Sequence, residues 1–217
     1  MQTIAGRDPV VMAIIVTLDS NVDDLRENLA NCSACMHLLI CDNSEDASQR
    51  ATIHQFAESQ CMYYLSMDGN KGIGYAQNRG IEFAEENGAE FVLLLDDDSR
   101  LMCTALSGLL QAYSVLQAKG FRIGAVCGRP IDCHDHNKDK VGCEVGVSTY
   151  CREMMSSGSL IPLVVLREVG LMDESLFVDY VDFEWGWRAI AQGYKLYFVN
   201  DVTFSHALAK GFMAYWV

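Results

Sequence analysis

The sequence predicts an α/β fold in which a mostly parallel, Rossmann-like sheet carries helices on both faces. Short apolar runs alternate with segments of helical periodicity through residues 1–120, the pattern of repeated strand–helix units. The runs are continuous, as in FVLLL (91–95), which is typical of strands buried on both faces. Half of the 217 residues are hydrophobic, enough to bury the core of one large domain.

The first half of the chain predicts four strands, each followed by a helix. We expect the strands at residues 10–18, 37–42, 62–67 and 91–95. We expect the helices from about residue 21, at 47–59, at 75–88 and at about 104–119. Asn87-Gly88 is placed to end the third helix and Gly120 the fourth, because both residue types tolerate the left-handed conformation of a helix C-terminus.

The second half predicts a looser series of elements. We expect strands at 124–128, near 143–150, near 157–163, and in the closing stretches YKLYFV and VTFSH. We expect helices at 162–170, which Pro162 begins, and at 181–193. The prediction is one domain over residues 1–217, in which residues 1–120 bind a nucleotide and residues 121–217 complete the active site.

The charge of the chain argues against nucleic acid as a partner. The formal net charge is −13 and the isoelectric point lies near 4.6, whereas nucleic-acid-binding surfaces are rich in lysine and arginine. A small phosphorylated ligand is compatible with this charge when a divalent cation lies between its phosphates and the carboxylates. The longest apolar run (10–18) is half the length of a membrane span and no signal peptide precedes it, so we expect a soluble, cytoplasmic protein.

The cysteines raise one question of metal binding. Nine scattered cysteines predict free thiols in a reducing compartment. The polar stretch CHDHNKDKVGC (133–143) contains four side chains of the types that bind zinc, namely Cys133, His134, His136 and Cys143. Their spacing is not that of a common zinc module, so a solvated loop is the favoured interpretation and a metal site the alternative.

Polar residues follow three of the expected strands directly. They are Thr17 and Asp19, then Asp42-Asn43-Ser44, then Asp96 to Ser99. Because ligands of open parallel sheets bind at the carboxyl ends of the strands, we expect these residues to converge on one rim.

The triple aspartate Asp96-Asp97-Asp98 allows two interpretations. Asp98 or Ser99 could simply cap the next helix, although capping does not require three carboxylates. Alternatively, two of the carboxylates bind Mg²⁺ or Mn²⁺, which typically takes one or two carboxylates together with substrate phosphate oxygens. In that case the cation is the positive partner of the aspartates and bridges to a diphosphate.

The glycine-rich stretch GNKGIGYAQNRG (69–80) also has two interpretations. It is not a dinucleotide fingerprint, because no third glycine follows at the required place and the loop follows the third strand. It is either a tightly packed helix entry, or a backbone free to approach a nucleotide beside Asn70, Asn78 and Arg79.

A second acidic cluster, DYVDFEWGWR (179–188), lies at the start of an expected helix. Asp182 is either the N-cap of this helix or a general base for a hydroxyl, and Glu184 is spaced to pair with Arg188. Trp185 and Trp187 are placed to form an apolar wall against a sugar or a base. His206, in VTFSH, is either a structural hydrogen-bonding residue or a metal ligand.

These motifs, taken together, resemble a known family. IIVTLD, LLICDNS, GNKGIGYAQNRGI, VLLLDDDS, the stretch from SSGSLIPL to DYVDFEWGWRA, GYKLYFVND and VTFSH follow one another over roughly residues 10 to 206. The set resembles the family 2 glycosyltransferases, inverting enzymes of the GT-A fold, and is most similar to their bacterial rhamnosyltransferases. In that branch DQDS is usual, so Asp97 here replaces a glutamine.

The resemblance implies a role for each residue of the rim. It places a nucleotide-sugar donor, a dTDP- or UDP-sugar, against Thr17, Asp19, Asp42, Asn43, Asn70, Gly72, Asn78, Asp96 and Asp97. It assigns the divalent cation, Mg²⁺ or Mn²⁺, to Asp98 and His206. It makes Asp182 the base that deprotonates the acceptor, with Gly158 and Trp185 on the acceptor side.

The implied reaction moves a sugar, L-rhamnose from dTDP-rhamnose, onto a saccharide or polyprenyl-linked saccharide in the synthesis of a cell-surface polysaccharide such as O-antigen. A lipid-linked acceptor implies peripheral contact with the inner face of the cell membrane. Relatives usually continue past the final histidine, so we expect a C-terminal extension to be lacking. One alternative is a catalytically inactive relative that binds a sugar nucleotide. The other is a haloacid-dehalogenase-like phosphatase, because LLLDDDS also resembles the first motif of those enzymes.

Overall fold

The structure is a computed structural model that describes residues 8–32, 36–132 and 148–206. Its strands are β1 (Val11–Thr17), β2 (Met36–Asp42), β3 (Tyr63–Ser66), β4 (Phe91–Asp96), β5 (Arg100–Leu101), β6 (Ile123–Asp132), β7 (Ser148–Cys151), β8 (Ser159–Pro162) and β9 (Lys195–His206). Its helices are α1 (Val22–Leu29), α2 (Ala47–Ser59), α3 (Ile73–Glu86), α4 (Ala105–Ala118), α5 (Leu163–Val169) and α6 (Val181–Ala191). The α/β architecture predicted from the sequence is confirmed.

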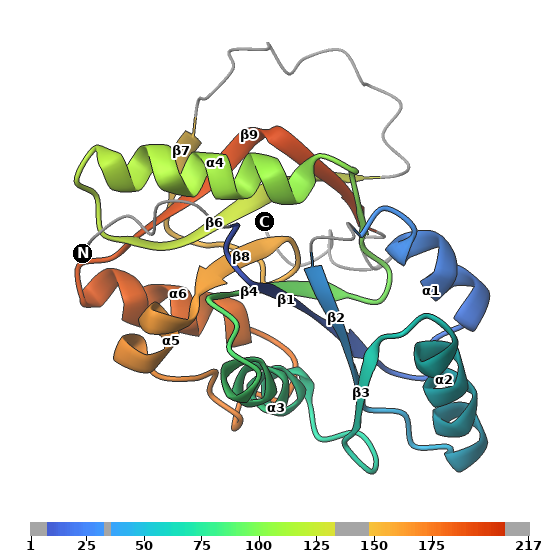
Figure 1. The fold of residues 1–217 in the computed structure, drawn as a ribbon. Coiled ribbons are helices and arrows are strands. Elements are labelled where there is room, and N and C mark those ends of the chain that lie inside the picture. Colours follow the sequence, from blue (N-terminus) through green and yellow to red (C-terminus); the bar gives the residue numbers. More distant parts are fainter. Residues whose placement is uncertain (1–7, 33–35, 133–147, 207–217) are drawn as a thin grey trace.

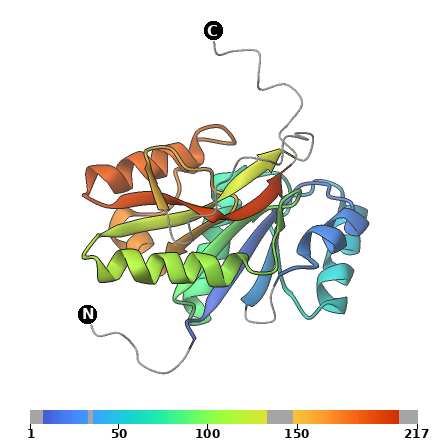
Figure 2. The ribbon, with the colours of Figure 1, turned by 90° about the horizontal axis from the view of Figure 1, so that it is seen from above.

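The strands form a single sheet in the order β3-β2-β1-β4-β8-β6-β9-β5, and β7 pairs with β9 beside this path. Helices α3, α5 and α6 lie on one side of the sheet and α4 on the other, while α1 and α2 gather near β2 and β3 (Figure 1). Viewed from above, α4 runs along β6 and β9, on which it packs (Figure 2). Because helices cover both faces, all seven residues of β1 are buried.

The first half of the sheet is parallel and brings three strand ends together. β1 pairs in parallel with β2 and with β4, so that Val16 lies between Cys41 and Asp96 in the register. β2 pairs in parallel with β3. The carboxyl ends of these strands therefore lie along one edge, as the strand–helix alternation predicts.

The second half is mixed. β8 inserts between β4 and β6 and is antiparallel to both, whereas β6 and β9 are parallel. The two expected closing strands form one continuous strand, β9, and a register shift between Gly128 and Arg129 of β6 leaves residues 200–202 of β9 without partners in β6. The two-residue strand β5 is absent from the sequence-based expectation.

Most helix ends lie where the sequence predicts them. The Asn21 side chain caps α1 by accepting hydrogen bonds from the backbone of Asp23 and Asp24. Helix α3 begins two residues earlier than expected and ends at Asn87, followed by Gly88 with a φ of +74°. In the described part of the chain, no helix combines the length and the apolar character needed to cross a membrane.

Candidate active site

The donor side of the rim is built around the buried carboxylate of Asp42. This side chain is 0% exposed. Its Oδ1 atom accepts hydrogen bonds from Thr17 Oγ1 (3.0 Å) and from the backbone N–H and hydroxyl of Ser44 (3.0 and 2.6 Å). Its Oδ2 atom accepts from Tyr64 (2.8 Å). Asp42 therefore ties β1, β2 and β3 together near their carboxyl ends, and neither Asp42 nor Thr17, both 0% exposed, contacts a ligand directly in this conformation, contrary to the prediction.

Asn43 fixes the glycine-rich loop to the end of β2. Its amide Nδ2 donates to the Gly72 carbonyl (3.1 Å), and its Oδ1 accepts from the Lys71 backbone (3.3 Å). Asn70 continues this network, since its Oδ1 accepts from the Gly72 N–H (3.1 Å). Asn43, Asn70 and Gly72 are thus brought together, as the sequence predicts.

Gly72 is also the point where the glycine-rich loop contacts the second half of the chain, at Phe177. It has a φ of +89°, and a Cβ atom there would lie 2.5 Å from the Phe177 carbonyl oxygen. The next residue, Ile73, donates its N–H to the same carbonyl (2.9 Å). The tightly packed helix entry considered from the sequence is therefore present, and only glycine fits at this position.

Asn78 lies away from the loop opening. Its side chain is 2% exposed; the amide donates to the Met172 carbonyl (3.0 Å) and to Glu174 Oε1 (2.9 Å). Its Oδ1 accepts from the Met172 N–H (2.9 Å). These bonds join α3 to the loop before α6, so Asn78 positions that loop and does not offer its amide to a nucleotide.

Of the three consecutive aspartates, Asp97 has a clearly defined partner. The Asp97 carboxylate accepts a hydrogen bond from the Ser20 hydroxyl, and burial raises the pKa of this carboxyl. Asp19 is exposed at the rim and donates its backbone N–H to Ser44 Oγ (2.9 Å). Asp96 and Asp98 are both half-buried at the end of β4. Asp97 is therefore bonded to the segment just before α1, which argues against its predicted contact with the nucleotide sugar, and Asp96 and Asp98 stay candidates for ligand binding.

The capping interpretation of Asp98 and Ser99 is wrong. The residues after them form β5, and α4 begins only at Ala105 with Thr104 as its N-cap residue. No side chain caps that helix. The acidic turn is thus separate from any helix start, which favours a ligand-binding role.

A serine pair that the sequence reasoning missed joins the two acidic motifs. Ser157 Oγ accepts a hydrogen bond from the Asp96 backbone N–H (3.0 Å) and lies 2.7 Å from Ser99 Oγ. The neighbouring residue, Ser156, donates its backbone N–H to Asp182 Oδ2 (3.1 Å). The donor-side aspartates and Asp182 are therefore held by two consecutive residues. The only sequence signal was their place in the SSGS stretch.

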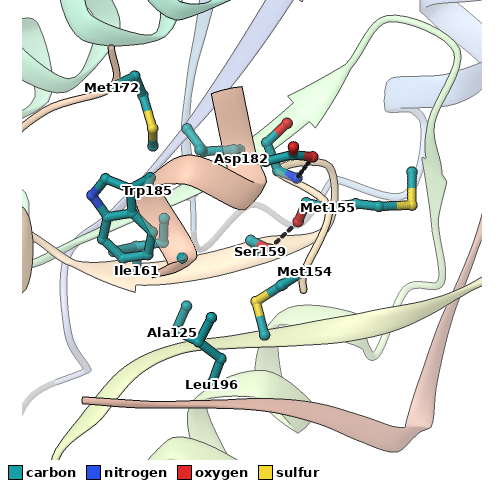
Figure 3. A pocket seen from close by; sticks show the side chains of 12 residues that line it. Ala125, Met154, Met155, Ser159, Ile161, Met172, Asp182, Trp185 and Leu196 are labelled. Carbon is teal, nitrogen blue, oxygen red and sulfur yellow. Dashed lines mark hydrogen bonds between the residues drawn. The ribbon is translucent and has the colours of Figure 1, made fainter. Parts of the chain in front are cut away.

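Asp182 is the second residue of α6, and the N-cap residue of this helix is Tyr180. The interpretation of Asp182 as the N-cap is therefore wrong. Besides the Ser156 bond, its Oδ1 accepts from the Phe183 N–H (2.8 Å). The carboxylate borders a small cavity of about 10 Å³, roughly the room of one water molecule, with apolar walls that include Met154, Met155, Ile161, Met172 and Trp185 (Figure 3). Burial against these walls raises the pKa of Asp182, which makes its carboxylate a stronger base.

Two predicted acceptor-side residues have structural roles instead. Trp185 is 3% exposed and donates its indole N–H to the Gly170 carbonyl (3.0 Å), so it belongs to the core and cannot face an acceptor. Gly158 is buried between β4 and β6, where a Cβ atom would lie 2.6 Å from the Phe204 ring. Trp187, by contrast, is 46% exposed. The predicted pair of Glu184 and Arg188 is confirmed at 2.6 Å.

The resemblance assigns a cation to Asp98 and His206, and the backbone segments that carry these two residues lie near each other in the sheet. Among the residues described, no group of three or more His, Cys, Asp or Glu side chains is arranged to hold a metal ion. Mg²⁺ and Mn²⁺ in phosphate-transfer sites, however, need only one or two protein ligands. β5 pairs antiparallel with β9, with Arg100 opposite Ser205, so the turn that carries Asp98 lies beside the strand end at His206. The Asp98 carboxylate is of a ligand type that such an ion accepts.

Two predicted metal-binding groups fall outside what the structure describes. The backbone of His206 ends β9, but its side chain is not described. The stretch with Cys133, His134, His136 and Cys143 lies wholly outside the described residues. The choice between a zinc site and a solvated loop there stays a prediction.

Comparisons with known proteins agree with this geometry. No family model matches the chain. The dTDP-rhamnosyl transferase RfbF of Shigella flexneri is 26% identical over 219 residues, which cover 91% of this chain and 69% of that protein.

Solved structures give the fold. A crystal structure of GalNAc-T7 with UDP, GalNAc and Mn²⁺ superposes with a TM-score of 0.68 and 14% identity over 92% of this chain. S. aureus TarS superposes with a TM-score of 0.67 and 14% identity over 92% of this chain, and its fragment 1–349 with 0.65 and 14% over 91%. The chain spans only 44%, 37% and 60% of these three solved chains. It is a protein of the GT-A glycosyltransferase fold, distantly related to a curated dTDP-rhamnosyl transferase.

Proposed function

We propose that this protein is an inverting glycosyltransferase that moves a sugar from a nucleotide diphosphate onto a saccharide acceptor. The observation that carries the proposal is the Ser156–Ser157 pair, which holds the Asp96–Asp98 turn and the Asp182 carboxylate around one rim. Donor-side aspartates and one buried base are the groups that such a transfer requires. No nucleophilic side chain is needed, because the acceptor hydroxyl attacks directly.

The donor proposal is L-rhamnose on dTDP, with a UDP-sugar as the alternative. The relative from Shigella flexneri bears the name of a dTDP-rhamnosyl transferase, and the GalNAc-T7 structure contains UDP. Asn70 lies on the open side of the loop and is proposed to contact the base, while the buried Thr17, Asp42 and Asn43 hold the loop and the strand ends in position behind it. Asp96 lies toward the ribose, and Asp19 is at the open edge.

Asp98 and His206 are proposed to hold Mg²⁺ or Mn²⁺. The cation would neutralise the charge that builds on the departing diphosphate. The acidic turn and the net charge of −13 support a cation here, because carboxylates and diphosphate oxygens repel each other unless a cation lies between them. The GalNAc-T7 structure of the same fold contains Mn²⁺.

Asp182 takes the proton of the acceptor hydroxyl as that oxygen attacks the anomeric carbon. A new carbon–oxygen bond forms on one face of the sugar while the bond to the diphosphate breaks on the other, so the anomeric configuration inverts. The Ser156 and Phe183 N–H groups orient the carboxylate, and the apolar cavity wall raises its basicity.

Turnover of dTDP-rhamnose and UDP-sugars with saccharide and polyprenyl-linked saccharide acceptors tests the proposal. We expect metal-dependent release of the nucleoside diphosphate and a glycoside product whose anomeric configuration, read by NMR, is opposite to that of the donor. Nucleotide binding without turnover on any acceptor would favour an inactive relative. Hydrolysis of p-nitrophenyl phosphate would favour the phosphatase alternative, for which the GT-A fold gives no support.

A further inference from the structure

A stripe of aromatic side chains lies along α6 beside Asp182. Tyr180, Phe183 and Trp187 are spaced three and four residues apart, so they share one face of the helix. The ring centroids of Tyr180 and Phe183 are 6.1 Å apart, and those of Phe183 and Trp187 are 6.4 Å apart. The opposite face of the helix is buried in the core through Val181, Trp185 and Ala189.

This stripe is unusually open to solvent for large apolar side chains. Tyr180 is 52% exposed and Trp187 46%, and the preceding loop adds Phe177 at 51% and Val178 at 59%. Exposed apolar groups gathered in one place mark binding sites more often than inert surface. Tyr180 also adopts a φ of +67°, a left-handed conformation that a bulky residue rarely takes.

We propose that Tyr180, Phe183 and Trp187 form a platform on which a neutral pyranose ring of the acceptor stacks. The inference rests on the proposed glycosyltransferase function and names the chemistry of its acceptor. The apolar C–H face of a pyranose packs against aromatic rings, while its hydroxyl groups stay free for hydrogen bonds. At 1.5 Å per residue the stripe is about 10 Å long, which accommodates two linked rings.

The charge around the stripe favours a neutral sugar over a lipid surface. Residues 171–187 contain no lysine or arginine but do contain Asp173, Glu174, Asp179, Asp182 and Glu184, of which Glu184 is paired with the following Arg188. Anionic membranes attract clusters of basic residues, and these carboxylates would be repelled from them. Neutral saccharides carry no such penalty, and their hydroxyl groups can donate hydrogen bonds to carboxylates.

The platform is fixed to both halves of the active site. Phe183 is the residue next to Asp182 and donates its backbone N–H to the Asp182 carboxylate (2.8 Å), so the stripe passes the residue that carries the proposed base. At the other end, the Phe177 carbonyl accepts from Ile73 N–H at the start of α3 (2.9 Å). The stripe thus runs along α6 past Asp182, and the loop before it contacts the start of α3.

The test follows the tryptophan indole and Phe183 amide signals of the ¹⁵N-labelled chain by NMR. Methyl α-L-rhamnopyranoside, methyl glucopyranosides and methyl N-acetylglucosaminide are added in turn, and the Trp187 signal is assigned from the Trp187→Phe variant. We expect at least one pyranoside to shift the Trp187 indole while the buried Trp185 indole stays unchanged. The affinity for the pyranoside, followed through the Phe183 amide signal, should be about tenfold weaker or more in Trp187→Ala.

Tyr150→Ala is the matched control, since Tyr150 is 45% exposed and contacts one ring, as Trp187 does. It should bind the pyranoside like the unaltered protein. The inference is overturned if no pyranoside moves the Trp187 signal, or if both variants lose binding equally. Binding to phosphatidylglycerol vesicles that disappears in Trp187→Ala would overturn it in favour of a lipid surface. A dTDP titration of the same sample separates the cases, because nucleotide binding without pyranoside binding contradicts only this inference.

Discussion

The backbone N–H of Ser156 donates a 3.1 Å hydrogen bond to Asp182 Oδ2, which ties the proposed base to the strand-end turn of the donor site. The next residue, Ser157, contacts Asp96 and Ser99 at the end of β4. A shift of one motif must therefore move the other. This short connection is the structural basis for treating the two acidic clusters as one site.

Replacement of Asp182 by asparagine should abolish most of the turnover. Asparagine keeps the size of the side chain but cannot accept the proton, so we expect kcat to fall by roughly 10²- to 10⁴-fold. Nucleotide binding should be unchanged, because the donor rim does not use this side chain. Steady-state kinetics and calorimetry on one preparation check both parts. An Asn variant with near-normal kcat would contradict the assignment of the base.

The pH dependence of turnover should report the raised pKa of Asp182. Burial lifts the pKa of this carboxyl above the ordinary value of 3.8, and only the deprotonated form is a base. The acid limb of the kcat/KM profile should therefore have an apparent pKa above 3.8. The folded state also binds this proton more tightly than the unfolded state, so Asp182 lowers the free energy of unfolding as pH rises between the two pKa values. In urea unfolding of Asp182→Asn at several pH values, the decrease in the free energy of unfolding that Asp182 causes should be absent.

Asp97→Asn should raise stability at neutral pH. Burial raises the pKa of Asp97, with the nearby charge of Asp98 adding to the effect, so the charged form is disfavoured in the fold. The Ser20 hydroxyl can still donate to the asparagine oxygen. The difference from the unaltered protein should shrink as pH falls through the raised pKa, since both side chains are then neutral. Equal or lower stability of the variant at pH 7 would count against this explanation.

Gly72→Ala should destabilise the fold and weaken nucleotide binding. The added Cβ would lie 2.5 Å from the Phe177 carbonyl oxygen, at a φ of +89°. Overpacking and the strained backbone together should cost roughly 2 to 4 kcal/mol in the free energy of unfolding. Gly88→Ala is the control, because its φ is +74° and no atom lies within 4 Å of its Cβ position. It should cost about 1 kcal/mol, from backbone conformation alone. Equal losses would show that the Phe177 contact is unimportant.

The sequence predicts the parallel half of the fold well because its information is local. Each buried strand is a continuous apolar run, and glycines follow the ends of α3 and α4, at Gly88 and Gly120. The acidic residues at the ends of these runs, Asp42 and Asp96–Asp98, are found for the same reason. Asp182 was predicted through a motif at a helix start, which is local as well.

The misses depend on contacts between distant segments. Ser157 acquires its role because β8 inserts antiparallel beside β4, which no pattern around Ser157 predicts. Trp185 and Trp187 look equivalent in the sequence, but α6 packs its Trp185 face on the core. The apolar spacing of Val181, Trp185 and Ala189 was the available signal for that face. Asn78 likewise bonds to a loop 94 residues away.

The most direct test of the proposed site is calorimetric titration of dTDP and UDP with and without Mn²⁺. Unaltered protein, Asp98→Ala and Asp97→Asn are compared, since Asp97 faces Ser20 and serves as the acidic control. We predict metal-dependent binding of dTDP in preference to UDP, lost in Asp98→Ala and retained in Asp97→Asn. Absence of binding of either nucleotide to the folded, unaltered protein with Mn²⁺ present would contradict the donor site.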